Sequence, residues 1–380
     1  MPKIPITQTN GVSAEDISDA IGRFLADRQR PEKGEASMQK KLTALFIGLG
    51  SIGTRHLNSI TALCAERGIP LTVHALRSYK NLSLRDGVAE KLDAQFTAVG
   101  QEGMLPHYDL VYITNPTSLH ADALRQVKEM AGAFFIEKPI VAANQTDIDL
   151  NWLLPKTQKA YVAAPMRWSA VMMAVKQWLA DHPDQRPYSA RVISSSYLPD
   201  WRPGVDYRTV YSAHRHLGGG VTIDLIHEWD YLVGLFGRPE QLYNFHGTYS
   251  DLEIDSDDVS VYIARWPHML AEVHLDYFGR KSQRYIELYT REGMVKGDFI
   301  NATLTLPDGT VQQFHETTAA WYRREMEYFL DYALHGEGES VNTPAEALDV
   351  LRLSLGESVL PFDPCDPQSV AEYAAKRAQW

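Results

Sequence analysis

The sequence predicts an α/β protein with two domains, the first built on a parallel sheet and the second an α+β domain with an antiparallel sheet. The chain has 380 residues, more than one hydrophobic core usually serves. From 41 to 165, short apolar segments alternate with helical ones, which is typical of a parallel sheet covered on both faces. From about 188, strand-like segments follow one another with short turns, which is typical of antiparallel pairing. We therefore predict domains at 41–165 and 166–360.

The ends of the chain are predicted to lie outside these domains. Residues 1–40 are polar, and "SAEDISDAIGRFLADRQR" predicts one appendage helix with Ser13 as its N-cap. Met38 is itself a plausible start, so we expect 1–40 to be an extension of the basic fold. Residues 361–380 are predicted to form a tail.

The elements of the first domain are the clearest. Its predicted strands are "LTALFIG", "LTVHAL", "DLVYIT", "AFFIEKP" and "AYVAAP", with helices "SIGTRHLNSITALCAERG" and "SLHADALRQVKEMAG" between them. The second domain is predicted to contain the strands "SARVISSSYL", "QLYNFHGTYS", "DVSVYIARW", "MLAEVHLDYF", "RYIELYTRE", "GMVKGDFI" and "ATLTL". Two helical segments, "WYRREMEYFLDYALHG" and "TPAEALDVLRLSLGESV", then close it.

Composition excludes several classes of partner. With 37 basic and 48 acidic residues the net charge is −11, which argues against nucleic acid or an anionic membrane as the main partner. No apolar run approaches the roughly 18 residues of a membrane span, and the N-terminus lacks a secretory pattern. Cys64 and Cys365 are the two cysteines, too few and too far apart for a disulfide framework or a cysteine metal site. We expect a cytoplasmic protein.

A glycine-rich loop follows the first strand. The segment "GLGSIG" places Gly48, Gly50 and Gly53 between this strand and the next helix, which begins around Ser51 and Ile52. Glycines let the backbone turn tightly and approach a pyrophosphate, and the helix N-terminus offers free N–H groups. The loop therefore predicts a dinucleotide site.

The end of the second strand favours NADP over NAD. An NAD site usually places an acidic residue there to hold the ribose hydroxyls, but this chain has Leu76, followed by Arg77, Ser78 and Lys80. An arginine pairs with a 2′-phosphate that a carboxylate would repel. The alternative is that Arg77 is only a surface residue.

Several short motifs in order resemble one known family. The segments "GLGSIGTRHL", "DLVYITNPTSLHADAL", "FFIEKPI" and "PMRW", followed by three glycines and an Asp–His segment, are similar to the Gfo/Idh/MocA oxidoreductases from about residue 42 to 360. The resemblance implies a Rossmann domain followed by an α/β domain with an open, mostly antiparallel sheet. It also implies a homodimer or homotetramer.

The resemblance implies roles for residues in these motifs. Lys138 of "EKP" would lie near the nicotinamide ribose and the reacting carbon, where an ammonium favours a developing alkoxide. Glu137 would border the cofactor and shape the turn together with Pro139, a candidate cis proline. The remaining matches are Asn115, Pro116 and His120 along the cofactor, and Arg167 toward the substrate.

The segment "GGGVTIDLIHEWDYL" carries the candidate acid/base pair. Family members often have an Asp and a His four residues apart, whereas Asp224 and His227 are three apart, still on one helical face. His227 fits a general acid/base that Asp224 orients. The alternatives are a buried histidine satisfied by its neighbours and an N-cap aspartate. Glu228 and Asp230 are predicted to pack or form salt bridges.

No metal site is predicted. The carboxylates around His227 lack a second soft ligand at metal spacing. His214 and His216 lie close in sequence but precede the glycines, in a loop expected to be mobile.

A long loop between 197 and 217 is the candidate substrate site. It concentrates rings that stack on sugar faces and guanidinium groups that hold anions, namely Trp201, Arg202, Tyr207, Arg208 and Tyr211. We therefore expect a small, sugar-like and anionic substrate. The alternative is a packing loop. A weaker similarity points to members of amino-sugar and surface-polysaccharide metabolism.

Together these features predict an NADP-dependent oxidoreductase acting on a secondary alcohol or ketone of a sugar-like compound. Two alternatives stay open, a non-catalytic dinucleotide-binding regulator and another chemistry with tightly held NAD, such as a hydrolase or a bilin reductase.

Overall fold

The computed structural model describes residues 41–78, 83–155, 158–358, 362 and 367–378. The predicted extension 1–40 with its Ser13 helix, together with Lys80 and Cys365, lies outside the described residues. Among the described helices, none combines the length and apolar character that crossing a membrane requires.

The N-terminal domain is a six-stranded parallel sheet with the strand order β3-β2-β1-β4-β5-β6. This confirms the predicted parallel sheet. The strands are β1 (Leu42–Ile47), β2 (Leu71–Leu76), β3 (Ala94–Phe96), β4 (Tyr108–Ile113), β5 (Ala131–Ile136) and β6 (Lys159–Val162), and the helices between them include α2 (Ser51–Glu66), α3 (His120–Val127) and α4 (Leu150–Leu153). Sequence patterns missed β3, since three residues are too few to show a period. The order reverses between β1 and β4, where ligands bind in open α/β sheets.

The second sheet has eight strands in the order β14-β13-β12-β11-β7-β10-β9-β8. Strands β7 and β10 pair in parallel and the other neighbours antiparallel, which confirms an open, mostly antiparallel sheet. The strands are β7 (Ser189–Tyr197), β8 (Gln241–Gly247), β9 (Val259–Arg265), β10 (Leu270–Asp276), β11 (Phe278–Tyr289), β12 (Met294–Asp298), β13 (Thr303–Thr305) and β14 (Val311–Gln313).

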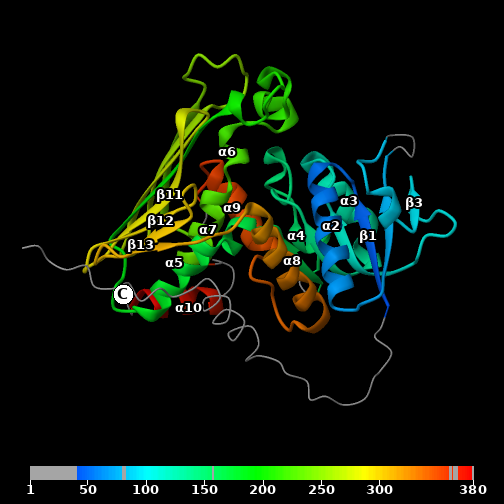
Figure 1. The fold of residues 1–380 in the computed structure, drawn as a ribbon. Coiled ribbons are helices and arrows are strands. Elements are labelled where there is room, and N and C mark those ends of the chain that lie inside the picture. The colour runs from blue at the N-terminus through cyan, green and yellow to red at the C-terminus, as the bar shows by residue number, and fades with distance from the viewer. Residues whose placement is uncertain (1–40, 79–82, 156–157, 359–361, 363–366, 379–380) are drawn as a thin grey trace, which may run out of the picture. The chain divides into compact units, whose positions relative to one another are not determined.

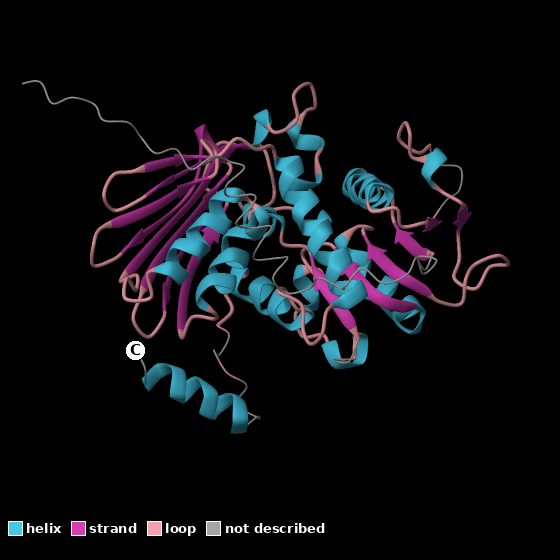
Figure 2. Ribbon diagram, turned by 60° about the horizontal axis from the view of Figure 1, so that its bottom comes forward, coloured by secondary structure: helices cyan, strands magenta, loops and turns pink. Residues whose placement is uncertain are grey.

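Helices cover one face of this sheet (Figures 1 and 2). They include α5 (Ala170–Asp181), α6 (Val221–Asp224), α7 (His227–Phe236) and α9 (Pro344–Ser354), and the last described helix is α10 (Pro367–Ala378). Along β9 and β10 burial alternates residue by residue, as expected for a sheet with one face toward a core. Apolar side chains remain exposed on the edge strand β8 and on its neighbours β9 and β10, among them Tyr243, Phe245, Ile263 and Leu270.

Helix α8 (Thr318–His335) completes the core of the N-terminal domain although it comes late in the chain. Its Met326, Phe329 and Leu330 are fully buried in one cluster with residues of the parallel sheet. Phe329 meets the rings of Tyr112 and Phe135 edge-on, at centroid distances of 5.6 and 5.2 Å. The helical period predicted this helix, but it does not say which sheet the apolar face covers.

One buried acid on α8 makes stability depend on pH. Burial, together with the nearby Glu137 and Asp230, raises the pKa of Glu325 well above its ordinary 4.5, although Ala164 N–H and Tyr161 O–H donate to its Oε1. Because the folded-state pKa is raised, the stabilising contribution is complete below pH 4.5. It is lost as pH rises toward the folded-state pKa.

We expect Glu325→Gln, which keeps the Oε1 acceptor, to remove this loss. Relative to the variant, the wild type should lose about 1.4 kcal/mol of unfolding free energy per pH unit between pH 4.5 and the raised pKa of Glu325. Urea unfolding from pH 5 to 8 measures both slopes, with the partly exposed Glu327→Gln on the same helix as the control. Equal slopes for wild type and Glu325→Gln would mean that Glu325 ionises normally.

Candidate functional site

The glycine loop lies where the carboxyl ends of β1 and β4 meet. Gly48 has a φ of +89°, and its N–H donates to the Leu76 carbonyl at 3.2 Å. A Cβ on Gly48 would lie 2.6 Å from the Asn115 Cα. The carbonyl of Gly48 also accepts from Thr114 Oγ1 at 2.6 Å. Only glycine permits this close approach of the two loops.

The N-terminus of α2 fits an anionic group. The helix begins at Ser51, its N-cap Gly50 offers no side-chain acceptor, and the first turn contains no acidic residue. The first N–H groups, including those of Ile52 and Gly53, are thus left for a ligand. A Cβ on Gly50 would meet nothing within 4 Å, so the surface above the loop is open. These features match the needs of a dinucleotide pyrophosphate.

Arg77 and Ser78 directly follow β2, as predicted. The Arg77 Nη1 donates to Gln95 Oε1 of β3 at 2.8 Å, so this guanidinium stands at the carboxyl edge of the sheet. No acidic residue replaces it at the end of β2. The preference of this edge for NADP stays a prediction.

A cis peptide bond joins Lys138 to Pro139, which confirms the predicted cis proline. Just before it, Glu137 Oε2 accepts from the Lys138 backbone N–H at 3.0 Å and Oε1 lies 2.5 Å from Nε2 of the fully buried His56. Burial alone would raise the pKa of Glu137, but His56 and Lys138 hold it below the ordinary value. Both carboxylate oxygens therefore brace the turn that carries Lys138, and they tie it to α2.

His120 joins two loops from inside. Its Nε2 lies 3.0 Å from the Asn115 carbonyl and its Nδ1 3.0 Å from the Pro139 carbonyl. The side chain is buried, and burial lowers its pKa. Pro116 follows Asn115 as the N-cap of a short turn, Thr117–Leu119. The ring of His120 thus positions the Asn115 loop against the cis-proline turn, and contact of these residues with a cofactor stays a prediction.

The segment after the glycines forms two helices rather than one. Helix α6 ends at Asp224 and α7 begins at His227, with Leu225 at φ −99° and ψ 31° between them. The sequence suggested a single amphipathic helix through both residues, and this prediction is therefore wrong. The break turns the Asp224 carbonyl toward Lys138, whose Nζ lies 3.4 Å from it.

Two tyrosines hold the Asp224 carboxylate. Tyr211 donates to Oδ1 and Tyr277 donates to Oδ2, each at 2.6 Å. In addition, the Trp201 ring meets Tyr277 edge-on at 5.2 Å and the Arg202 guanidinium lies 5.6 Å from the Tyr211 ring centre. The structure thus brings three predicted loop residues, Trp201, Arg202 and Tyr211, together with Asp224. Tyr277 was missed because it lies 53 residues away in a strand segment with no motif of its own.

Burial and two nearby cations act on His227. Burial, then Lys138 and Arg284, lower its pKa well below the ordinary value. In the described part of the chain its ring makes no hydrogen bond. A neutral imidazole with an unused nitrogen fits a proton acceptor. The neighbouring Glu228 is fully buried and pairs with Arg284 through contacts of 2.7 and 2.9 Å, the salt bridge predicted for it.

Arg167 has protein partners on every side. It donates to both carboxylate oxygens of Asp230 at 2.9 Å and to Glu346 Oε1 at 2.7 Å. Its remaining contacts are the carbonyls of Asp230 and Val341. Asp230 thus forms the predicted salt bridge, and this network fastens α7 to the loop before α5. Substrate contact by Arg167 stays a prediction.

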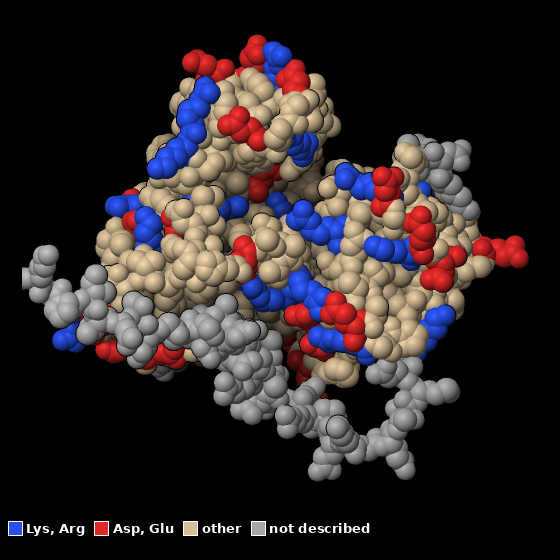
Figure 3. Space-filling view, in the orientation of Figure 1, with Lys and Arg blue, Asp and Glu red and all other residues tan. Residues whose placement is uncertain are grey.

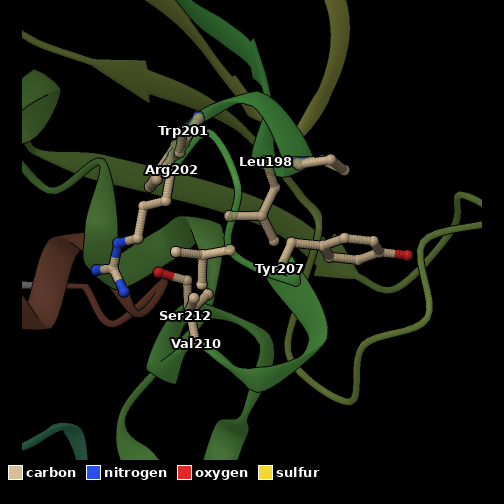
Figure 4. Close-up of a pocket in the computed structure, with 8 residues that line it drawn as sticks. Leu198, Trp201, Arg202, Tyr207, Val210 and Ser212 are labelled. Carbon is tan, nitrogen blue, oxygen red and sulfur yellow. The ribbon is translucent and has the colours of Figure 1, made fainter.

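The candidate substrate loop contains a small pocket (Figure 4). Its lining is mostly apolar, with the side chains of Arg202 and Tyr207 extending in opposite directions. The lining residues are Leu198, Pro199, Trp201, Arg202, Val205, Tyr207, Val210 and Ser212. Tyr207 accepts from the Glu253 N–H at 3.2 Å, and Arg208 pairs with Asp206 and Glu253. These two residues therefore contact the 252–257 loop instead of Asp224.

Comparisons with known proteins agree with this geometry. Residues 42–163 match the model of the Gfo/Idh/MocA oxidoreductase family, NAD-binding Rossmann fold. No curated protein sequence matches the chain.

Several solved structures share the fold. A levoglucosan dehydrogenase in complex with NADH and levoglucosan has a TM-score of 0.69 at 15% identity, covering 89% of this chain and 98% of its own. A myo-inositol 2-dehydrogenase from Lactobacillus plantarum has a TM-score of 0.65 at 17% identity, covering 83% of this chain and 96% of its own. The UDP-N-acetylglucosamine 3-dehydrogenase GnnA from Acidithiobacillus ferrooxidans has a TM-score of 0.63 at 18% identity, covering 83% of this chain and 96% of its own. The glycine loop, the cis-proline turn and the reversal of strand order agree with the family match, which identifies residues 42–163 as an NAD-binding Rossmann domain of the Gfo/Idh/MocA type.

Proposed function

We propose that the protein is an NADP-dependent oxidoreductase that interconverts a secondary alcohol and a ketone on a sugar-like substrate. The observation that carries the proposal is the 3.4 Å contact of Lys138 Nζ with the Asp224 carbonyl. It places a cation from the Rossmann domain beside the Asp224–His227 segment of the second domain. A site of this kind, formed where two domains meet, is a common place for a small-molecule substrate.

The bound dinucleotide would supply the hydride acceptor or donor. The open loop at Gly50 and the uncapped start of α2 would hold its pyrophosphate. The ammonium of Lys138 stabilises negative charge on the substrate oxygen, and the neutral His227 accepts the proton from the hydroxyl. The carboxylate of Asp224, fixed by Tyr211 and Tyr277, lies in the same segment and orients the substrate hydroxyls.

The substrate class follows from the loop around Asp224. Trp201 and Tyr211 offer ring faces, and Arg202 offers a guanidinium beside them, a combination that suits a polyhydroxylated ring bearing an anionic group. The solved structures of similar fold include dehydrogenases of levoglucosan, myo-inositol and UDP-N-acetylglucosamine. Sugar acids and nucleotide sugars are therefore the first compounds to test, in keeping with amino-sugar or surface-polysaccharide metabolism.

We also propose a cytoplasmic homodimer or homotetramer. The exposed Tyr243, Phe245, Ile263 and Leu270 on β8 to β10 support association, because exposed apolar side chains of this kind favour contact with a second copy.

The test follows absorbance at 340 nm with NADP⁺ or NADPH across aldonates, nonulosonates, nucleotide sugars and inositols. Net consumption of the cofactor supports the oxidoreductase. Cofactor that binds but returns to its starting oxidation state while the substrate is cleaved supports the hydrolase. Tight binding without turnover of any compound supports the regulator.

Arg77 provides a separate prediction on cofactor choice. We expect Arg77→Ala to weaken NADPH binding about tenfold and to leave NADH binding within about twofold, since one charge-assisted contact to the 2′-phosphate is removed. Fluorescence titration of both cofactors measures this. The exposed Arg85→Ala is the matched control. If the binding of both cofactors weakens equally, Arg77 serves to hold the edge of the sheet through Gln95 and does not contact the 2′-phosphate.

A further inference from the structure

Two histidines and an aspartate from separate loops meet on the surface of the second domain. His214, His216 and Asp255 each offer one ligand atom, and these three atoms lie within 4.8 Å of one another. His214 Nδ1 and Asp255 Oδ2 are 4.0 Å apart, and the two imidazole rings have centroids 5.5 Å apart. A cation at the centre of such a triangle would reach all three with small rotamer adjustments, because metal–nitrogen and metal–oxygen bonds are about 2.0–2.2 Å.

Backbone hydrogen bonds fix these residues against each other. The Asp255 N–H donates to the Ala213 carbonyl at 3.0 Å, and the Arg215 N–H, between the two histidines, donates to Asp255 Oδ1 at 2.7 Å. Ser256 Oγ adds a bond of 2.7 Å to the Ser212 carbonyl. The backbones of the two loops and the Asp255 carboxylate are thus held in place before any ion arrives. This lowers the entropy that binding must overcome.

The donor atoms remain available to a ligand. In the described part of the chain, neither imidazole donates or accepts a hydrogen bond, and Asp255 Oδ2 meets only His214. The side chains of His214 and Asp255 are 32% and 62% exposed, so an ion can reach them. The segment 250–258 carries five acidic residues. Both acidic and basic side chains lie at the top of Figure 3, so the attraction for a cation comes mainly from the nearby Asp255 carboxylate.

We propose that His214, His216 and Asp255 bind one Zn²⁺-like divalent cation. Two imidazole nitrogens and one carboxylate oxygen match the ligand types of zinc, with water completing the tetrahedron. Magnesium prefers an octahedron of oxygen atoms, so it fits this set poorly. The sequence does not indicate this site because its ligands are far apart in the chain. Asp255 lies 40 residues after Arg215, the residue between the two histidines, whose N–H donates to it.

Zinc would stabilise the loop that reaches the candidate active site. Tyr211, which donates to Asp224, precedes His214 by three residues, and His214 accepts the Gly219 N–H through its carbonyl. An ion held by His214 and Asp255 adds a fourth link to the three hydrogen bonds between the loops. Amide exchange over 207–219 should therefore slow when Zn²⁺ is bound, whether or not the protein has the proposed activity.

The decisive experiment is calorimetric titration of the full chain, prepared without a polyhistidine tag, with ZnCl₂ and separately with MgCl₂. We expect one zinc ion per chain and no measurable heat from magnesium. His216→Ala and Asp255→Asn should each weaken zinc binding at least about tenfold. Asp255→Asn retains an Oδ1 acceptor for the Arg215 N–H, so it tests the ligand without removing that bond. Thermal unfolding without zinc checks that both variants fold.

The matched control is His107→Ala, an exposed histidine in the first domain. It should bind zinc as the wild type does. The proposal is overturned if the wild type binds no zinc, if His216→Ala and Asp255→Asn bind it unchanged, or if His107→Ala loses binding equally. Failure of the proposed oxidoreductase activity would leave each of these results unaffected.

Discussion

Lys138→Ala will lower kcat by about 10²–10⁴-fold while binding of the dinucleotide changes little. The range is typical for removing a positioned group that stabilises charge or assists proton transfer. The Nζ of Lys138 lies 3.4 Å from the Asp224 carbonyl, at the junction of the two domains. The Lys138 side chain makes no other described hydrogen bond, so its loss removes charge from the site without breaking a core contact. Steady-state rates at 340 nm and fluorescence titration of NADPH measure the two quantities.

The control for Lys138→Ala is Lys176→Ala, which removes an exposed lysine from α5. It should have wild-type kcat. A Lys138→Ala variant that turns over as fast as the wild type would remove Lys138 from the chemistry. A variant that also loses the cofactor would mean that the cation serves binding instead, and unchanged thermal unfolding would exclude loss of the fold.

Local patterns predicted the N-terminal domain well. The glycine loop, the strand before it and the helix after it are continuous in sequence, and the backbone geometry that Gly48 requires is local as well. The cis bond before Pro139 was predicted by resemblance to known motifs. Features of this kind need no knowledge of the tertiary fold.

The rest of the site depends on contacts between distant segments. His56 and Glu137 are 81 residues apart, and Glu228 and Arg284 are 56 apart. No local sequence pattern indicates either pair. The segment "GTRHL" contains His56, but nothing near it in sequence indicates that it bonds to Glu137. The break at Leu225 was equally hidden, because the apolar residues on both sides keep the helical period.

The candidate substrate loop shows where composition stops being informative. Its rings and arginines looked equivalent in sequence, yet they separate into two groups. Arg202 lies beside the Tyr211 ring, and Trp201 meets Tyr277. Both tyrosines donate to Asp224. Tyr207 and Arg208 instead bond to Glu253 of the 252–257 loop. Contacts with segments distant in sequence decide which loop residues reach Asp224, and residue type alone does not reveal those contacts.

Two glycines of one loop should separate folding from cofactor binding. Gly53→Ala places a Cβ 2.5 Å from the Gly48 carbonyl oxygen and 2.7 Å from Thr114 Oγ1, so the backbone must shift. We expect it to lower the unfolding free energy by about 1–3 kcal/mol, the usual cost of overpacking a buried position. Gly50→Ala meets nothing within 4 Å, so its stability should match that of the wild type.

Gly50→Ala should nevertheless weaken NADPH and NADH binding at least about tenfold, or about 1.4 kcal/mol, because the added methyl group occupies the space that a pyrophosphate needs above the loop. Thermal unfolding without cofactor and fluorescence titration with it measure the two effects on the same samples. Full cofactor affinity in a stable Gly50→Ala protein would show that the phosphates do not lie over this loop. Since Gly50 makes no packing contact that its alanine variant could disturb, a loss of affinity at unchanged stability has one physical origin, direct contact between the backbone at Gly50 and the dinucleotide.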